Sequence, residues 1–193
     1  MKITVIGCGR WGSLITWYLD SIGHEVTLYG RKTSKTMERF LRERKNDLLE
    51  LPESIHLTTE IACAKEAEVI VISVNSQGLQ ALMDELKPLD LTDKIFVLCM
   101  KGIEIASGRR LSQVVNDNTD FSNEVAVWLG PGHVEEFYQG TPNCMVIHSN
   151  NQKLKERLVQ EFSSDLIRFY YGQDLIGSEI GPAAKNVIGI AAG

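Results

Sequence analysis

The sequence contains few cysteines, and their spacing gives them no shared role. Cys8, Cys63, Cys99 and Cys144 are scattered over 193 residues without a CxxC pair, and no histidine stands where it would complete a metal-binding set. A zinc site or a disulfide framework would need closer and more regular spacing. We therefore expect reduced thiols and no bound metal.

Long apolar runs and an excess of basic residues are also absent. No run approaches the length of a membrane span, and the opening "MKITVIG" is too short, and too abruptly ended by glycine, for a secretion signal. The formal net charge of -5 provides no broad basic surface for nucleic acid or an anionic membrane. These absences predict a cytoplasmic protein with no membrane span and no nucleic-acid partner.

The sequence is rich in short β-branched runs that alternate with helix-length amphipathic segments. Strands are expected in "KITVIG", "EVTLYG", "SIHLTT", "EVIVISV", "KIFVLCM", "EVAVWLG", "NCMVIHS" and "LIRFYY". The early runs are apolar almost throughout, which is typical of strands buried on both faces. The alternation predicts an α/β fold, a doubly wound, Rossmann-type, mostly parallel sheet with helices on both faces.

Three helices can be placed between the expected strands. Apolar residues recur at helical spacing over 11–22, and Gly23 provides a left-handed stop. Charged segments over 34–50 and 149–164 predict two further helices, the later one with a Ser or Asn cap.

A glycine-rich turn joins the first expected strand to the first expected helix. In "VIGCGRWG", Gly7 permits a tight turn, Gly9 lets a pyrophosphate approach the backbone, and Gly12 lets the helix pack closely on the strand. The phosphate would rest on the helix N-terminus, where free N–H groups and the helix dipole favour an anion. Because strand, turn and helix occur in the required order, we predict dinucleotide binding rather than an ordinary turn.

The end of the second expected strand bears on which dinucleotide binds. An Asp or Glu usually binds the ribose hydroxyls of NAD there, but "TLYGRKTSK" has Arg31 and Lys32 instead. Cations suit a 2′-phosphate, and Arg31 can also stack on adenine. NADP is therefore favoured over NAD without excluding NAD. The alternative is an exposed basic turn, which suits Lys32 better than Arg31.

Further segments follow strands at the carboxyl edge of the expected sheet, where ligands of such folds bind. They are "SVNSQ", "CMKGIE" and "GPGHVEE". Lys101 could anchor a substrate or be a surface lysine. Gly130 and Gly132 flank a proline in a rigid turn, which could lie against a ligand or only connect a strand to a helix.

These motifs together resemble the NAD(P)-dependent glycerol-3-phosphate dehydrogenase family. The matching stretches are "VIGCGRWGS", "GHEVTLYGR", "CMKGIE", "GPGHVEEFYQGTPNCMVI" and "EIGPAAKNVIGIAAG", in the order and approximate spacing of the family. The resemblance implies reduction of the small molecule dihydroxyacetone phosphate to sn-glycerol 3-phosphate with NAD(P)H, for phospholipid synthesis. It also implies that the nicotinamide delivers hydride to the carbonyl carbon while a lysine handles the proton on the oxygen.

The resemblance implies roles for single residues. Lys185 matches the catalytic lysine. The implied substrate-binding residues are Lys101, Gly130, Gly132 and Asn186. With the glycine loop and the basic turn included, the expected cofactor site comprises Gly7, Gly9, Arg10, Trp11, Gly12, Arg31, Lys32, Asn75, Lys101 and Val134.

The chain departs from the family pattern in several places. Gly132 stands where Ser or Asn is usual, His133 replaces an apolar aromatic residue, and Asn75 replaces a proline. An aromatic-Leu-Pro segment that commonly walls the nicotinamide site is missing around 48–52. The residues that hold the substrate phosphate in the family belong to a helical second domain, and we expect them beyond residue 193.

The final stretch, "EIGPAAKNVIGIAAG", is expected to open that second domain. We predict a dinucleotide-binding domain over 1–172 and the first helix of the helical domain over 173–193. Because proline is costly inside a helix but tolerated at its first position, we expect a kink or restart at Pro182, with Lys185 in the first turn of the resumed helix. The apolar stripe of this helix would favour pairing, as in a homodimer, or aggregation.

Two functions of different class remain open from the sequence. The first is an oxidoreductase, or the cofactor-binding part of one. The second is a non-catalytic NAD(P)-binding module, or another reductase of the hydroxyacid dehydrogenase type.

Overall fold

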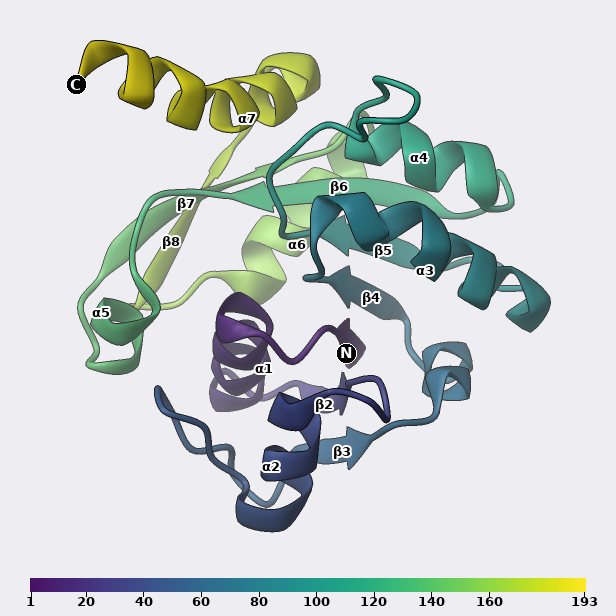
Figure 1. Cartoon of the computed structure of the whole chain (residues 1–193), viewed down its shortest axis with the longest axis vertical. Helices are drawn as coiled ribbons and strands as arrows, with labels where there is room; N and C mark the ends of the chain where they lie inside the picture. Colours follow the sequence, from purple (N-terminus) through teal and green to yellow (C-terminus); the bar gives the residue numbers. More distant parts are fainter.

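An eight-stranded sheet organises the chain (Figure 1). The computed structural model describes the backbone of residues 1–193 and every side chain except that of Asn186. The strands are β1 Lys2–Ile6, β2 Glu25–Tyr29, β3 His56–Thr58, β4 Val69–Ile72, β5 Ile95–Leu98, β6 Glu124–Leu129, β7 Asn143–His148 and β8 Ile167–Tyr171. Each of the expected runs contains one of these strands, so the strand predictions are confirmed.

The strand order confirms a doubly wound, mostly parallel sheet. From edge to edge the order is β3-β2-β1-β4-β5-β6-β7-β8. The loop after β1 therefore lies at the crevice where the direction of winding reverses, which is where such sheets bind ligands. β6 and β7 pair antiparallel, with Val127 opposite His148 and Leu129 opposite Val146, whereas the other neighbouring strands of the described sheet are parallel.

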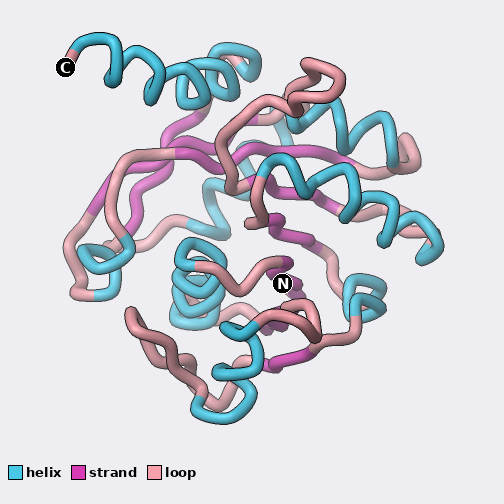
Figure 2. Tube along the Cα trace, in the orientation of Figure 1, coloured by secondary structure: helices cyan, strands magenta, loops and turns pink.

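Helices connect most of the strands and cover both faces of the sheet (Figure 2). They are α1 Arg10–Ser21, α2 Lys35–Glu43, α3 Leu79–Leu86, α4 Leu111–Asn118, α5 Val134–Tyr138, α6 Gln152–Phe162 and α7 Leu175–Ala192, with short 3-10 turns η1 Ile61–Lys65, η2 Ser76–Gly78 and η3 Lys87–Leu89. Gly23, with a φ of 94°, follows the end of α1, and Asn151 caps α6 by accepting from the N–H group of Leu154. Both boundaries agree with the sequence prediction.

The second helix is shorter than predicted. α2 ends at Glu43 instead of near residue 50, because Arg44 adopts a left-handed backbone conformation with a φ of 54°. Asn46 then holds the following turn, since its side-chain oxygen accepts from the N–H group of Leu49 at 3.0 Å. Leu49 and Leu51 are buried, so this segment contributes to the core instead of extending a charged helix.

Two hydrophobic clusters fill the space on the two faces of the sheet. α1, α2, α5 and α6 pack on one face, and α3 and α4 pack on the other. Alternation along β6 sends Trp128 to the first cluster and Val127 and Leu129 to the second. The face that carries Val127 and Leu129 is the one over which α7 passes (Figure 1).

The predicted restart of the last helix at Pro182 is wrong, whereas the kink that was its alternative stays a prediction. α7 runs without interruption from Leu175 to Ala192, with Pro182 inside it, and Asp174 caps its beginning by accepting from the N–H group of Gly177. Proline removes one backbone donor and crowds the carbonyl group four residues earlier, and the helix continues despite this cost. Lys185 therefore lies well beyond the first turn. Within the described residues no helix combines the length and apolar character of a membrane span.

Candidate functional site

The three glycines after β1 have the separate roles that a dinucleotide-binding turn requires. Gly7 has a φ of 117°, and a Cβ there would lie 2.2 Å from the carbonyl oxygen of Ser73. A Cβ on Gly12 would lie 1.8 Å from the carbonyl oxygen of Gly7, so α1 packs directly on the turn. A Cβ on Gly9 would meet no described atom within 4 Å. Gly9 is thus open to a ligand, whereas the fold itself fixes the other two.

A cavity of about 300 Å³ adjoins this loop. Its lining includes Gly7, Gly9, Tyr29, Arg31, Ser34, Asn75 and Glu85. Arg31 and Asn75, both predicted for the cofactor, therefore share a cavity with the glycine loop. An open backbone turn at a helix N-terminus and a guanidinium group are two features that bind phosphate groups. The cavity has the donors that a phosphorylated nucleotide needs.

Some of this lining was not predicted from the sequence. Glu85 lies on α3, far along the chain from the glycine loop, and faces the same cavity as Tyr29. The pKa of Tyr29 is raised, first by burial and then by the Glu85 carboxylate. Lys32 is absent from the described lining, and its ammonium group pairs with Glu60 at 2.7 Å on the exposed surface.

Arg10 and Trp11 connect the glycine loop to α5. Arg10 forms a 2.7 Å ion pair with Glu135, and both side chains are exposed. The pKa of Glu135 is lowered, first by a backbone hydrogen bond at its own residue and then by Arg10. The rings of Trp11 and Phe137 lie 5.7 Å apart. Because exposed ion pairs contribute little to stability, Arg10 can exchange Glu135 for an anionic ligand at small cost.

A larger cavity, of about 430 Å³, lies between α7 and the sheet. Lys101, Gly130 and Lys185, which the sequence predicts for substrate binding and catalysis, all line it. The rest of its lining is Val127, Leu129, Pro131, Val146, His148, Ser178, Gly181 and Pro182. Two lysines at one cavity with a mostly apolar wall make it a candidate site for a small anionic molecule.

A narrow space of about 20 Å³ adjoins the larger cavity. Trp11 and Cys99 line it together with Lys101 and Gly130, and the last two also line the larger cavity. Burial strongly raises the pKa of Cys99, so this thiol stays protonated. Trp11 stands at the beginning of α1, directly after the glycine loop, so the narrow space lies between this end of α1 and the Lys101 turn.

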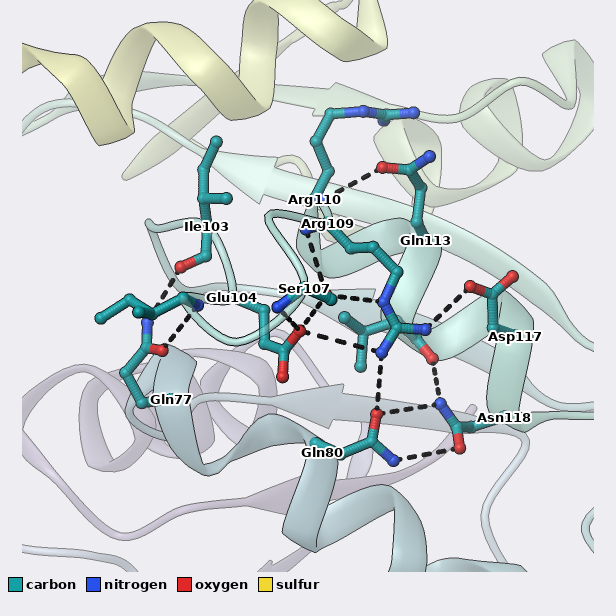
Figure 3. Close-up of polar contacts among 12 residues, drawn as sticks. Gln77, Gln80, Ile103, Glu104, Ser107, Arg109, Arg110, Gln113, Asp117 and Asn118 are labelled. Atoms are coloured by element: carbon teal, nitrogen blue, oxygen red, sulfur yellow. Dashed lines mark hydrogen bonds and ion pairs between the residues drawn. The ribbon is translucent and has the colours of Figure 1, made fainter.

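The loop that carries Lys101 is held in place by side chains from neighbouring elements (Figure 3). Gly102 has a φ of 141°, and a Cβ there would lie 2.6 Å from the Ser76 hydroxyl, so the position requires glycine. Gln77 donates to the carbonyl of Ile103 at 2.9 Å and accepts from the N–H group of Ile105 at 3.0 Å. These hydrogen bonds fix the turn immediately after Lys101.

Two further predicted residues, Gly132 and Val134, are placed apart from the described cavity linings. Gly132 has a φ of 119°, and a Cβ there would crowd Phe137 and Asn143, so local packing explains this glycine. Val134 is buried in the core at the start of α5. The side chain of Asn186, predicted to contact substrate, lies outside the described residues.

His148 and Ser178 are residues of the larger cavity that the sequence did not reveal. The Nδ1 atom of His148, on β7, lies 3.2 Å from the Ser178 hydroxyl, on α7. Burial lowers the pKa of His148, and the neighbouring Lys155 lowers it further. The antiparallel register of β6 and β7 puts His148 opposite Val127 and on the cavity side, and only this register could have identified it.

Metal-binding side chains do not gather in the described part of the chain. No group of three or more His, Cys, Asp or Glu residues is arranged to hold an ion among the described side chains, and the four cysteines are free thiols.

Comparison with known proteins agrees with this geometry. The sequence profile of a family described as "NAD-dependent glycerol-3-phosphate dehydrogenase N-terminus" matches residues 2–155. A curated relative from Thermoanaerobacter sp. (strain X514), named glycerol-3-phosphate dehydrogenase (NAD(P)+), is 34% identical over 199 residues, covering 100% of this chain and 59% of the relative. A relative of the same name from Streptomyces coelicolor is 34% identical over 198 residues, with the same two coverages. The chain thus spans 59% of the length of these relatives.

A solved structure supports the same relationship. The crystal structure of glycerol-3-phosphate dehydrogenase from Coxiella burnetii superposes with a TM-score of 0.89 at 25% sequence identity. The superposition covers 98% of this chain and 59% of that chain. Because so little of this chain is left out, the superposition includes α7 as well as the sheet.

Proposed function

Because the chain belongs to the NAD-dependent glycerol-3-phosphate dehydrogenase family, we propose that it is the nucleotide-binding part of an oxidoreductase that reduces dihydroxyacetone phosphate to sn-glycerol 3-phosphate. The observation that carries this proposal is the meeting of Lys101, Gly130 and Lys185 at one cavity. Lys101 and Gly130 also line a narrow space with Trp11, which stands next to the phosphate loop. The product would supply the synthesis of glycerophospholipids.

The proposed cofactor is NADP or NAD, held along the carboxyl edge of β1, β2 and β4. The open backbone at Gly9 would receive the pyrophosphate, with Arg10 and Trp11 at the start of α1 beside it. Arg31 and Asn75 line the cavity that would receive the adenosine half. When bound, the nicotinamide supplies hydride to the carbonyl carbon of the substrate. Lys32 and Val134 stay predicted contacts.

We favour NADP over NAD because of Arg31. Its guanidinium group lines the cavity beside the phosphate loop, and it can bind a 2′-phosphate through paired N–H donors. Lys32 gives less support, because its ammonium group is paired with Glu60. The preference therefore rests on one residue, and a single substitution tests it.

The two lysines have complementary proposed tasks. Lys101, on the fixed turn after β5, would attract and orient the anionic substrate. Lys185 would donate a proton to the carbonyl oxygen as hydride reaches the carbon, so that the ketone becomes a secondary alcohol with charge balanced. Gly130 would let the substrate approach the backbone. Gly132 and Asn186 stay predicted substrate contacts.

Residues 1–172 are our proposed dinucleotide-binding domain, and residues 173–193 our proposed first helix of a helical domain. Exposed apolar side chains on α7 support this division, because such a surface is usually covered in the complete protein. Because a second copy of the chain could cover the same apolar surface, we also propose a homodimer. We also propose a cytoplasmic location, on family membership.

Two measurements test the proposed function. We expect the chain to bind NADPH, and the Arg31→Ala variant to lose affinity for NADPH by about ten-fold or more, as when a charged hydrogen bond of about 1.5–3 kcal/mol is removed. NADH affinity should change much less. Failure of the chain to bind either nucleotide would refute the proposed cofactor site.

The second measurement is NADPH oxidation in the presence of dihydroxyacetone phosphate. We expect Lys185→Ala to lower the rate by about 10²–10⁴-fold, the usual contribution of a general acid. Lys153→Ala, at an exposed lysine at the beginning of α6, is the matched control and should leave the rate unchanged. A Lys185→Ala rate equal to that of the control would contradict the proton-transfer role.

A non-catalytic NAD(P)-binding module is the second candidate, and one observation favours it. Lys185 is exposed to solvent. An exposed lysine is poorly placed to move a proton selectively, because water competes with the substrate for it. Nucleotide binding without any turnover would favour this candidate over the enzyme.

A further inference from the structure

Glu179 is a buried carboxylate on α7 for which the proposed chemistry has no use. Its side chain is 4% exposed, although Val187, Ile188 and Ile190 further along the same helix are exposed. A buried carboxylate without partners would cost several kcal/mol. The identity of its partners therefore shows what the residue does.

The partners of Glu179 all lie at the beginning of α4. One carboxylate oxygen accepts from the backbone N–H group of Ser112 at 2.9 Å. The other accepts from the Ser112 hydroxyl at 2.6 Å and from the Arg110 guanidinium at 2.6 Å. Free N–H groups and the positive end of the helix dipole at this place favour a negative charge. The carboxylate thus joins α7 to the first turn of α4.

The residues that bind Glu179 stand at the end of the same loop that carries Lys101. Arg109 and Arg110 are adjacent in the chain, yet their side chains point in opposite directions (Figure 3). Arg109 binds Asp117 at 2.9 Å and Gln80 at 3.2 Å, within α4 and α3. Arg110 binds Glu179 on α7 instead. Arg109 thus fixes the end of the Lys101 loop, and Arg110 fixes α7, the helix that carries Lys185.

We infer that Glu179 is a positioning residue, which holds α7 against α4 so that Lys185 stays at the cavity that Lys101 also lines. The inference rests on the proposed function for the role of Lys185, but the anchoring itself does not. Glu179 precedes Lys185 by six residues, or about 9 Å along a helix that rises 1.5 Å per residue. If α7 tilts when the contact at Glu179 is lost, the Lys185 ammonium group moves with the helix.

Few other polar contacts share this task among the described side chains. Asp174 bonds to Gly177 within the same helical turn, so it shapes the beginning of α7 without joining it to the sheet. His148 reaches Ser178 at 3.2 Å, through a single pair of neutral groups. A buried, charge-assisted set of three hydrogen bonds is the stronger attachment.

Chemical cross-linking tests the anchoring directly. A short amine-reactive cross-linker should join Lys101 to Lys185 in the wild-type chain, and mass spectrometry measures the yield. The yield of a Lys65–Lys94 cross-link serves as the internal reference, because the Lys94 ammonium group binds the carbonyl of Lys65 at 2.8 Å, far from α7 in the sequence. We expect Glu179→Gln to lower the Lys101–Lys185 yield about ten-fold relative to this reference, which corresponds to about 1.4 kcal/mol.

A matched variant separates anchoring from loss of stability. Tyr18→Phe removes a buried hydroxyl that binds the carbonyl of Phe162 and Ser164 on the other face of the sheet, and it should leave the relative Lys101–Lys185 yield unchanged. If Glu179→Gln does not fold, Ser112→Ala removes one donor only and should lower the yield in the same direction. An unchanged yield in the folded Glu179 or Ser112 variant, or an equal loss in Tyr18→Phe, would overturn the inference.

NADPH titration of the same proteins keeps the two proposals apart. We expect Glu179→Gln to bind NADPH as tightly as the wild type, since neither Glu179 nor the residues that bind it belong to the described lining of the cavity beside the phosphate loop. If the chain turns over substrate, the Glu179→Gln variant should lose kcat while KM for NADPH stays the same, and Tyr18→Phe, which removes a buried hydrogen bond elsewhere, should keep the wild-type kcat. A wild-type chain that binds no NADPH would overturn the proposed function, and the cross-link would still decide the anchoring.

Discussion

The glycines of the phosphate loop look alike in sequence but differ in what surrounds each of them. The fold leaves no room for a Cβ at Gly12, whereas it leaves open space at Gly9. Their substitution therefore separates folding from binding. An alanine tests each role with the same chemical change, the addition of one methyl group.

We expect Gly12→Ala to cost more than about 3 kcal/mol of unfolding free energy, because its Cβ would lie inside the contact distance of a backbone oxygen and overpacking is already costly at ordinary core sites. Gly9→Ala should change stability by less than about 0.5 kcal/mol and weaken NADPH binding by more than about ten-fold. Urea denaturation and fluorescence titration measure the two effects. A Gly9→Ala chain that binds NADPH normally would show that the pyrophosphate does not approach this backbone.

Residue-level prediction from the sequence succeeded where position in the chain decides position in space. Lys101 and Gly130 follow strands, so the carboxyl edge of the sheet brings them together with no further information. Lys185 came from the family motif alone. His148 and Glu85 escaped prediction, because the register of β7 and the rotation of α3 decide which cavity they face.

Secondary-structure elements were predicted well where burial on both faces leaves a clear sequence pattern. β4 and β5, which are buried at every residue, show this pattern, whereas β8 alternates between buried and exposed residues and was recognisable by its β-branched and aromatic side chains. α7 was predicted less well, because the local cost of Pro182 was weighed without its tertiary contacts. Asp174 caps the beginning of this helix, and Glu179, one turn before the proline, attaches it to α4.

Two buried histidines, His148 and His24, make stability depend on pH. Burial, and then Lys155, lower the pKa of His148, and burial lowers that of His24 near α6. A histidine with a lower pKa in the folded chain binds more protons when unfolded, so the free energy of unfolding decreases as the pH falls below the unfolded value of about 6.5.

We therefore expect the urea concentration at the midpoint of unfolding to decrease as the pH is lowered from about 7.5 to about 5.5, a range that includes that value. His148→Gln should remove part of the fall, because glutamine does not titrate. The control is His56→Gln, at an exposed histidine on β3. An identical pH dependence in His148→Gln and in the wild type would contradict a lowered pKa at His148.

On the scale of the whole molecule, the two hydrophobic clusters are built almost entirely before residue 173. Every buried member of both clusters precedes that position, and Leu175 is a partly buried addition to one of them. The sheet and its helices thus have their own core. The later residues of α7 contribute little to it.

We expect a chain ending at residue 172 to remain folded and to bind NADPH with an affinity within about three-fold of the longer chain, a difference below ~1 kcal/mol. Circular dichroism and nucleotide titration test this. The Lys101 cavity should be lost, because Ser178, Pro182 and Lys185 form its α7 wall. A truncated chain that fails to fold would contradict the proposed domain boundary.

Lys101 lines both the narrow space beside Trp11 and the larger cavity under α7. One residue therefore borders two spaces at once. Two ligands that both contact it are energetically linked, and linkage is reciprocal: whatever affinity the first ligand adds to the second, the second adds equally to the first. A shared side chain can thus couple the two ligands without any moving part, and the coupling is the same whichever of them binds first.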